Sequence, residues 1–195
     1  MTDDVLRFPR MPGGVPDDVV HAVEALLFAA GEPVTSHALS DALGLQRRLV
    51  EHALVALEDR RRGSGVELRA VAGGWQLRTA SRFADAVNAL RGSKPKSLSA
   101  AALEVLSVIA YRQPVTRGEV DALRGVDSGR VVKALVEQGL ARVAGRRDQP
   151  GRPLEYRTTG GFLEMFGLSS LTDLPTLAER RDLVGREVDT ERSEE

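Results

Sequence analysis

Residues 28–55 read FAAGEPVTSHALSDALGLQRRLVEHALV, and residues 109–136 read IAYRQPVTRGEVDALRGVDSGRVVKALV. With a shift of 81 positions, the Pro-Val-Thr triplets, a following glycine and the Ala-Leu-Val triplets of the two stretches coincide. Where the two copies carry different residues at equivalent positions, both residues are often apolar, as at Leu39 and Val120. Self-similarity at a fixed spacing indicates a repeated structural unit, so the chain is predicted to contain two copies of one unit of about 75 residues.

The first copy has the pattern of three helices followed by a β-hairpin. Apolar residues recur at helical spacing over residues 17–30, 36–43 and 46–62, with a Gly-Glu-Pro stop after the first helix and a glycine after the second. The period then changes to two over residues 66–70 and 75–78, which are separated by an Ala-Gly-Gly turn. Three helices and a hairpin form the winged-helix arrangement, an elaborated helix-turn-helix.

The second copy repeats this order, and its hairpin has a longer connection. Helices are expected over residues 99–111, 116–124 and 128–138, and strands over 140–144 and 154–158. A polar, arginine-rich loop joins the two strands. The fold class is therefore predicted to be α+β, mainly helical, with two tandem winged-helix domains.

Aromatic and aliphatic residues after each hairpin are expected to pack back on their own unit. They are Phe83, Val87 and Leu90 in the first copy and Phe162, Leu163 and Phe166 in the second.

The composition describes a globular chain without a strong attraction for polyanions. Hydrophobic residues make up 42% of the 195 residues, which is enough to bury a core, and the net charge is −1. A chain with this charge balance lacks the long-range electrostatic term that dominates non-specific DNA binding. The first residues are acidic and hold prolines and glycines in place of an apolar signal core, so a cytoplasmic location is expected.

The sequence contains no recognisable catalytic or metal-binding motif. Cysteine is absent, which excludes disulfides, thiolate metal ligands and a catalytic thiol. His21, His37 and His52 have no ligand spacing, and no glycine is followed by lysine, as a phosphate-binding P-loop would require. The chain is therefore predicted to be no enzyme and to need no metal or cofactor.

Winged helices often bind DNA, and a dimeric DNA-binding transcriptional regulator is the alternative hypothesis. The third helix of the first copy presents Arg47 and Arg48, but Glu51 follows on the same helix. In the second copy the hairpin loop adds Arg147. These three arginines are candidates for a weak DNA contact, whereas the acidic neighbours disfavour DNA binding as the main function.

The first helix of each copy is apolar nearly all round. Only His21 and Glu24 are polar within residues 19–30, and only Glu104 and Ser107 within residues 100–111. A surface helix needs one apolar stripe, so the surplus indicates a covering layer or a partner. The alternative is that several of these alanines simply favour helix formation.

Four strings in the chain closely resemble the bacterial segregation and condensation protein B family. They are VEALLFAAGEPVTSHALSDALGL (23–45), GGWQLRT (73–79), LSAAALEVLSVIAYRQPVTRGEVDALRGVDS (98–128) and GRRDQPGRPLEYRTTGGFLEMFGLSSLTDLP (145–175). The resemblance extends over residues 17 to about 177, and its motifs are long, ordered and correctly spaced.

The resemblance implies a non-enzymatic adaptor in chromosome condensation and segregation. Members of this family are expected to consist of two winged-helix domains and to form homodimers through the N-terminal one. They are expected to bind the central region of a kleisin, segregation and condensation protein A, which closes a ring with a structural-maintenance-of-chromosomes (SMC) ATPase. ATP hydrolysis then belongs to the partner, DNA contact is indirect or weak, and the protein associates with the nucleoid and not with a membrane.

The expected organisation follows from the repeat and the resemblance together. A disordered tail is predicted over residues 1–16, a dimerising winged-helix domain over 17–91, a linker over 92–97, a kleisin-binding winged-helix domain over 98–175 and a charged tail over 176–195.

Candidate interface residues follow from the apolar helices, the long loop and the resemblance. The dimerisation candidates are Val20, Val23, Leu27 and Phe28. The kleisin-binding candidates are Tyr111, Arg112, Gln113, Arg146, Arg152 and Pro153, because rigid loops lose little entropy on binding and Arg and Tyr are favoured interface anchors. The alternative is that Tyr111 and Pro153 pack the core and that Arg152 pairs with Glu155.

Overall fold

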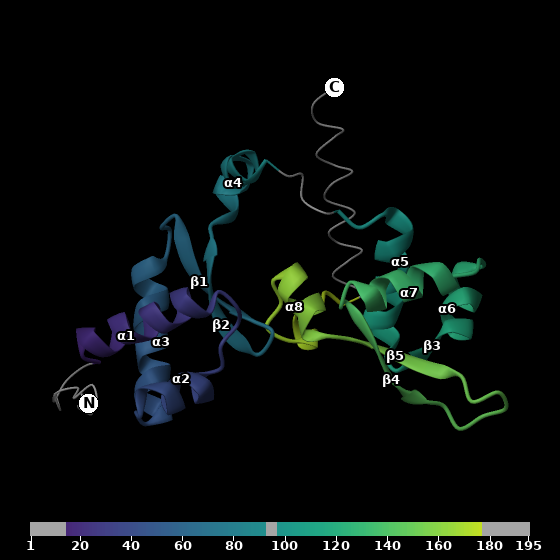
Figure 1. Ribbon diagram of the computed structural model, residues 1–195, viewed down its shortest axis with the longest axis horizontal. Helices are drawn as coiled ribbons and strands as arrows, with labels where there is room; N and C mark the ends of the chain where they lie inside the picture. The colour runs from purple at the N-terminus through teal and green to yellow at the C-terminus, as the bar shows by residue number, and fades with distance from the viewer. Residues whose placement is uncertain (1–14, 93–96, 177–195) are drawn as a thin grey trace, which may run out of the picture.

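The computed structural model describes residues 15–92 and 97–176, which form a mainly helical mixed α and β structure (Figure 1). The first half contains α1 (Asp17–Ala30), α2 (Ser36–Leu43), α3 (Arg47–Arg61), β1 (Val66–Val71), β2 (Gly74–Thr79), a 3₁₀ turn (Ser81–Phe83) and α4 (Ala84–Arg91). The second half contains α5 (Ala100–Arg112), β3 (Val115–Thr116), α6 (Arg117–Arg124), α7 (Gly129–Glu137), β4 (Ala141–Arg146), β5 (Leu154–Thr158), α8 (Gly160–Phe166) and a 3₁₀ turn (Leu171–Asp173).

The predicted tails and linker lie mostly outside the described residues. At the near edge of the N-terminal tail, Val15 packs against the core of the first half, and the Pro16 carbonyl accepts a 3.0 Å hydrogen bond from the Val19 N–H. The first helix therefore has its first contacts two residues earlier than the sequence pattern indicated.

Side-chain caps fix where several helices begin. The Thr35 hydroxyl accepts a hydrogen bond from the Ala38 N–H at 3.1 Å at the start of α2. The equivalent residue of the second copy, Thr116, forms a capping box with Glu119 at the start of α6. Such caps satisfy backbone donors that have no partner inside the helix, so both second helices start at the same repeat position.

The strand after each third helix belongs to a small antiparallel sheet. In the first half β1 pairs with β2 through a turn at Ala72 and Gly73, which have φ values of 51° and 74°. In addition Val34 forms an isolated antiparallel bridge with Trp75. In the second half the sheet order is β3-β5-β4, and β3 was not predicted from the sequence.

The two copies use the same short pairing to close the unit. Val115 pairs with Tyr156, and both residues lie 81 positions after Val34 and Trp75. In the first half this approach depends on Gly74, because a Cβ there would lie 2.9 Å from the Val34 backbone. A side chain at that position would separate Val34 from the strand.

Each half buries its own group of apolar side chains. In the first half the buried residues are Val19, Val20, Val23, Leu27, Leu39, Leu43, Val50, Ala53, Leu54, Leu57 and Leu68. In the second half they are Val105, Leu106, Ile109, Ala110, Val115, Val120, Val132, Leu135, Leu140, Ala141 and Phe162. The two groups share no member, and α1 and α5 bury different repeat positions: Ile109 is 0% exposed, whereas Phe28, 81 positions earlier, is exposed.

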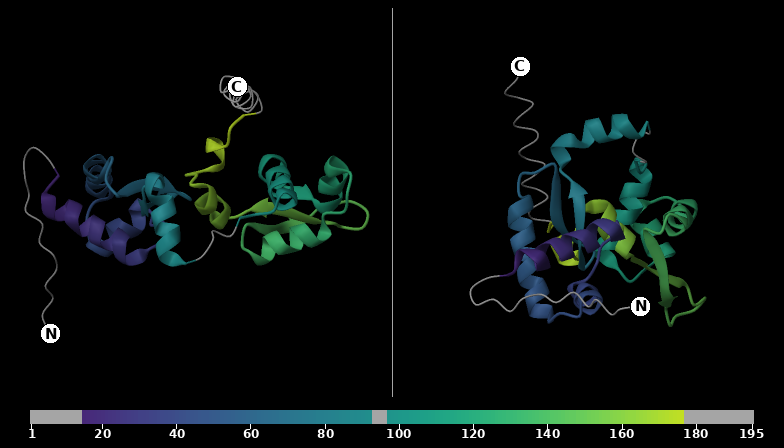
Figure 2. Two further views of the ribbon diagram at one scale, coloured as in Figure 1. Left: turned by 90° about the horizontal axis from the view of Figure 1, so that it is seen from above. Right: turned by 60° about the vertical axis from the view of Figure 1, so that its left-hand side comes forward.

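The β1–β2 turn of the first half contacts the segment after α8, which lies between the two halves (Figures 1 and 2). The N–H groups of Ala72 and Gly73 donate to the carbonyls of Leu168 and Ser169, each at 2.9 Å. Arg78 Nη1 also donates to the Glu164 carbonyl at 3.1 Å. The hairpin thus has a second set of backbone partners besides its own strands.

The prediction for the segment after the first hairpin was wrong at Leu90. Leu90 is 89% exposed and Phe83 is 43% exposed, with the Arg82 guanidinium 4.7 Å from the Phe83 ring centroid. This segment forms α4, which contributes no fully buried residue. In the second copy Phe162 is buried as expected, whereas Phe166 is 45% exposed.

No helix within residues 15–92 and 97–176 is long and apolar enough to cross a membrane.

The burial of α1 gives a testable contrast in stability. Leu27 is 1% exposed, so Leu27→Ala should lower the free energy of unfolding by about 2–5 kcal/mol. The same change at the exposed Leu90 should alter it by no more than about 0.5 kcal/mol. Urea unfolding followed by the fluorescence of Trp75, which packs against the same core, measures both. Equal losses for the two variants would contradict this assignment of the core.

Candidate functional site

The β4–β5 loop, residues 147–153, is held to the body of the second half by one arginine. Arg147 Nε donates to Glu155 Oε1 at 2.8 Å, and its Nη2 donates to the Pro114 carbonyl at 3.0 Å. Its Nη1 forms an ion pair with Glu119. Arg147 therefore joins the loop to β5, to the start of α6 and to the residue before β3.

These contacts shift the pKa of Arg147 and the pKa of Glu119. Hydrogen bonds to Glu155 and then to Glu119 raise the pKa of Arg147. The Thr116 backbone N–H, followed by the Arg147 guanidinium, lowers the pKa of Glu119 below its ordinary value. The charge of Arg147 is thus matched by two carboxylates. A phosphate would have to displace both carboxylates, and the predicted DNA contact at Arg147 stays a prediction.

Arg146 and Arg152, the two kleisin-binding candidates among the arginines of this hairpin, are accessible. Arg146 is exposed, and its Nη1 donates to the Arg152 carbonyl at 3.1 Å. Arg152 is exposed with a φ of 39°, and its backbone N–H donates to the Gln149 carbonyl at 2.8 Å. Arg147, and not Arg152, pairs with Glu155. The backbone of the loop is therefore fixed while the Arg152 guanidinium lies in solvent.

Pro153 is half-buried beside β5. It lines a shallow cavity of about 320 Å³ together with Arg117, Leu154 and Tyr156. Its carbonyl accepts a hydrogen bond from the Arg147 N–H at 2.9 Å. Pro153 therefore packs in the hairpin and is partly exposed to solvent.

Gln113, at the end of α5, contacts the last residue of β5 with its whole amide. Its Nε2 donates to the Ala110 carbonyl at 3.0 Å and to Thr158 Oγ1 at 3.1 Å. Its Oε1 accepts from the Thr158 N–H at 3.0 Å. The amide of Gln113 is therefore engaged inside the fold, whereas Arg112 beside it is exposed, and the partner contact at both residues stays a prediction.

Tyr111 lies at the rim of an apolar cavity of about 200 Å³. Its hydroxyl donates to the Pro175 carbonyl at 2.7 Å, and its side chain is 39% exposed. The other lining residues are Leu103, Leu106, Ser107, Ala110, Phe162, Phe166, Leu174 and Pro175. This cavity could not be predicted from the sequence, because no periodic pattern indicates that residues 174–175 return to α5.

The dimerisation candidates on α1 divide into buried and exposed residues. Val20, Val23 and Leu27 are 0–1% exposed in the core of the first half, so they cannot form a surface for a second copy without unfolding. Phe28 is 80% exposed. It lies on an exposed stripe with Ala25, one turn earlier on the same helix. The apolar surplus of α1 therefore supplies both a core face and an accessible face.

The remaining DNA-contact candidates lie at the exposed start of α3. Arg47 Nε is 3.2 Å from Glu51 Oε1, one turn further along the helix. Arg48 is exposed. A potential metal site is absent from the described ranges 15–92 and 97–176, where no group of three or more histidine or carboxylate side chains could hold an ion.

Comparison with known proteins shows which family the chain resembles. The model of "Segregation and condensation complex subunit ScpB" matches residues 21–177. Segregation and condensation protein B of Syntrophotalea carbinolica is 51% identical over 163 residues, which cover 83% of each chain.

Two solved structures also match. ScpB from Mycobacterium tuberculosis is 38% identical, with a TM-score of 0.37, and the match covers 78% of this chain and 96% of that one. A dimer of a ScpB N-terminal domain complexed with a ScpA peptide is 25% identical, with a TM-score of 0.37 and coverage of 38% and 95%.

The contacts of Glu119 predict a specific dependence of stability on pH. Because its pKa is lowered in the folded state, its contribution is present above the ordinary value of 4.5 and is lost as the pH falls through the folded-state pKa. Glu119→Gln should therefore be less stable than wild type at pH 7, and the difference should shrink below pH 4.5. Urea unfolding followed by circular dichroism measures this. Glu137→Gln, on the exposed end of α7, is the control for loss of one carboxylate, and a pH-independent difference for Glu119→Gln would contradict the assignment.

Proposed function

The chain belongs to the segregation and condensation protein B family, and from this we propose that it is a non-enzymatic adaptor of an SMC–kleisin complex in chromosome condensation and segregation. The observation that carries the proposal is the family match over residues 21–177, which spans both halves. In this role the chain forms a homodimer and holds the central region of a kleisin. The SMC ATPase joins through the kleisin, in the cytoplasm at the nucleoid.

We propose that each half is one winged-helix domain, over residues 17–91 and 98–175, with residues 92–97 as the linker. Three helices and an antiparallel hairpin in each half support this division. The separate groups of buried side chains support it as well. The first domain would mediate dimerisation and the second would bind the kleisin.

The kleisin contact is proposed at the end of α5 and on the β4–β5 loop. Arg112 and Arg152 supply accessible charge, and Arg146 lies next to Arg152. Tyr111 supplies a partly exposed ring beside an apolar cavity. Gln113 and Arg147 act as positioning residues, because their side chains fix the helix end and the loop from within. A preorganised surface of this kind loses little conformational entropy when a peptide binds.

Dimerisation is proposed through the exposed face of α1 around Phe28. Burial of a phenylalanine side chain contributes about 1.5–3 kcal/mol, so an 80% exposed Phe28 favours association with a second copy.

A dimeric DNA-binding regulator is the second candidate function, and exposed Arg47 and Arg48 are the observation in its favour. These residues are at the start of the helix that enters the major groove in helix-turn-helix proteins. Arg47, however, already pairs with Glu51.

Reversal of charge separates the two functions. Arg112→Glu/Arg152→Glu should weaken binding to the kleisin encoded in the same genome by about tenfold or more, because both arginines face solvent at the proposed contact. Arg47→Glu/Arg48→Glu, an equal charge change on α3, should bind the kleisin as wild type does. Isothermal titration calorimetry gives both affinities, and circular dichroism checks folding. If only the α3 variant changes, and it changes binding to duplex DNA, the regulator hypothesis is favoured.

The dimer contact is tested at one residue. Phe28→Glu should weaken self-association by at least about tenfold, since a charge cannot be buried at an apolar contact without a partner. Leu90→Glu places the same charge on a residue that is 89% exposed and should leave the dimer intact. Light scattering over a range of concentrations measures both. A wild type that is monomeric at every concentration would overturn the dimer proposal.

A further inference from the structure

The two copies differ at the edge of their last strand. In the second copy the Thr158 N–H at this edge donates to Gln113 Oε1 at 3.0 Å. The residues 81 positions earlier are Leu77 and Glu32. Within the described part of the chain, the Leu77 N–H has no such partner on Glu32, so the edge that is occupied in the second copy is open in the first.

The direction of this open edge follows from the Val34 bridge. Trp75 donates its N–H to Val34 at 2.8 Å and accepts from the Val34 N–H at 2.9 Å. Backbone groups alternate between the two sides of a strand, so Leu77 and Thr79 direct their N–H and C=O groups to the same side as Trp75. Among the backbone hydrogen bonds that residues 15–92 and 97–176 form outside their helices and strands, none involves these four groups, and Val34 occupies the first position of an otherwise missing third strand.

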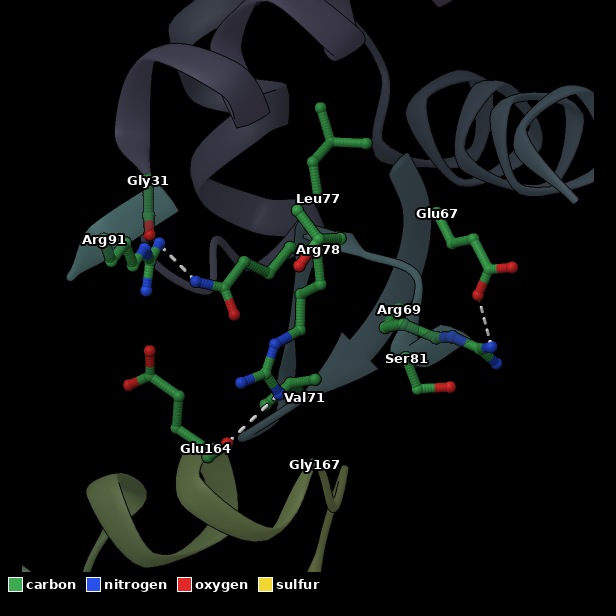
Figure 3. Close-up of a pocket in the computed structure, with 12 residues that line it drawn as sticks. Gly31, Glu67, Arg69, Val71, Leu77, Arg78, Ser81, Arg91, Glu164 and Gly167 are labelled. Atoms are coloured by element: carbon green, nitrogen blue, oxygen red, sulfur yellow. Dashed lines mark hydrogen bonds and ion pairs between the residues drawn. The ribbon is translucent and has the colours of Figure 1, made fainter. Parts of the chain in front are cut away.

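A polar cavity of about 740 Å³ adjoins this edge (Figure 3). Leu77 and Thr79 line it together with Gln76. Gln76 is only 7% exposed. Gln76 Nε2 donates to the Gly31 carbonyl at 2.8 Å. Gln76 Oε1 is buried without a hydrogen-bond partner among the described residues. A buried acceptor without a partner is costly, so this atom favours an occupant that brings a donor.

The charges around the cavity favour an acidic occupant. Arg69 is paired with Glu67. Arg78 donates Nη1 to the Glu164 carbonyl and has no carboxylate partner in the described structure, and Arg91, from α4, forms no ion pair or hydrogen bond with the described residues. Glu164 is the second carboxylate of the lining. The lining therefore carries three arginines and two glutamates, which leaves a net positive charge beside the open strand edge.

We propose that the β2 edge at Leu77 and Thr79 binds an extended, acidic peptide segment as an added strand. Backbone hydrogen bonds to an open edge give affinity for any extended chain, and the neighbouring side chains select its sequence. The proposed function supplies the occupant, and the inference rests on it: the segment belongs to the kleisin. This site is separate from the contact at α5 and the β4–β5 loop, so one kleisin would contact both halves.

Amide hydrogen exchange of the full chain, with and without the kleisin from the same genome, tests the edge directly. The Leu77 and Thr79 amides should exchange freely in the unbound protein and become at least about tenfold slower in the complex. The Ala70 amide is the control, because it points outward from β1 on the opposite edge of the same hairpin.

Matched variants test the same edge through affinity. Thr79→Pro removes one outward N–H from an exposed residue and should weaken kleisin binding by about tenfold, as should Arg91→Glu. Ala70→Pro removes the equivalent donor on the other edge and should bind as wild type does. Circular dichroism confirms that each variant folds, and Arg91→Glu, which leaves the strand unchanged, tests the site even if a proline variant does not fold.

The outcomes separate this inference from the proposed function. If wild type does not bind the kleisin, the proposed function fails. If it binds while the Leu77 and Thr79 amides gain no protection, the edge site fails and the proposed function stands. Protection of these amides already in the free chain would assign the edge to another segment of this chain or to a second copy, which would overturn the kleisin assignment.

Discussion

The structure depends on a short backbone pairing that occurs once in each half. After the first helix ends, one valine pairs with an aromatic residue of the last strand, Val34 with Trp75 and Val115 with Tyr156. This pairing connects the end of the helix to the sheet and sets the direction of the second helix, which begins one residue later at its threonine cap. It also determines which backbone groups of the last strand remain available on its outer side.

The bounds of α1–α3 and α5–α7 could be predicted from the sequence to within one residue because they rest on local signals, whereas α4 and α8 were not predicted as helices. The caps Ser99 and Thr116 lie where two helices of the second copy were predicted to begin, and the change in period marked the strands. The short pairing could not be predicted, since two residues have no periodicity. The contacts of Arg147 were missed for a different reason. They join Arg147 to a side chain 28 positions away and to a backbone carbonyl 33 positions away, and only the folded hairpin brings these groups together.

The apolar surplus of α1 was recognised, but its division between core and surface could not be derived from composition. Val23 and Leu27 face the core, whereas Phe28, the next residue, is 80% exposed. A helix whose faces are both apolar provides no polar stripe to mark the outside, so its rotation is set by the partners that pack against it. The fold determines that Phe28, and not its neighbours, is accessible for association.

The repeat has produced two units with the same framework and different outer surfaces. In the second, Gln113 occupies the strand edge and Arg147 fixes the loop. In the first, the hairpin is short, the strand edge is open and a buried amide oxygen lacks a partner. Because the framework is set by the same pairing in both, these side chains could diverge without loss of the fold. Two unlike surfaces on one chain suit a long, extended partner better than a compact one, since an extended segment can reach both without a large interface at either.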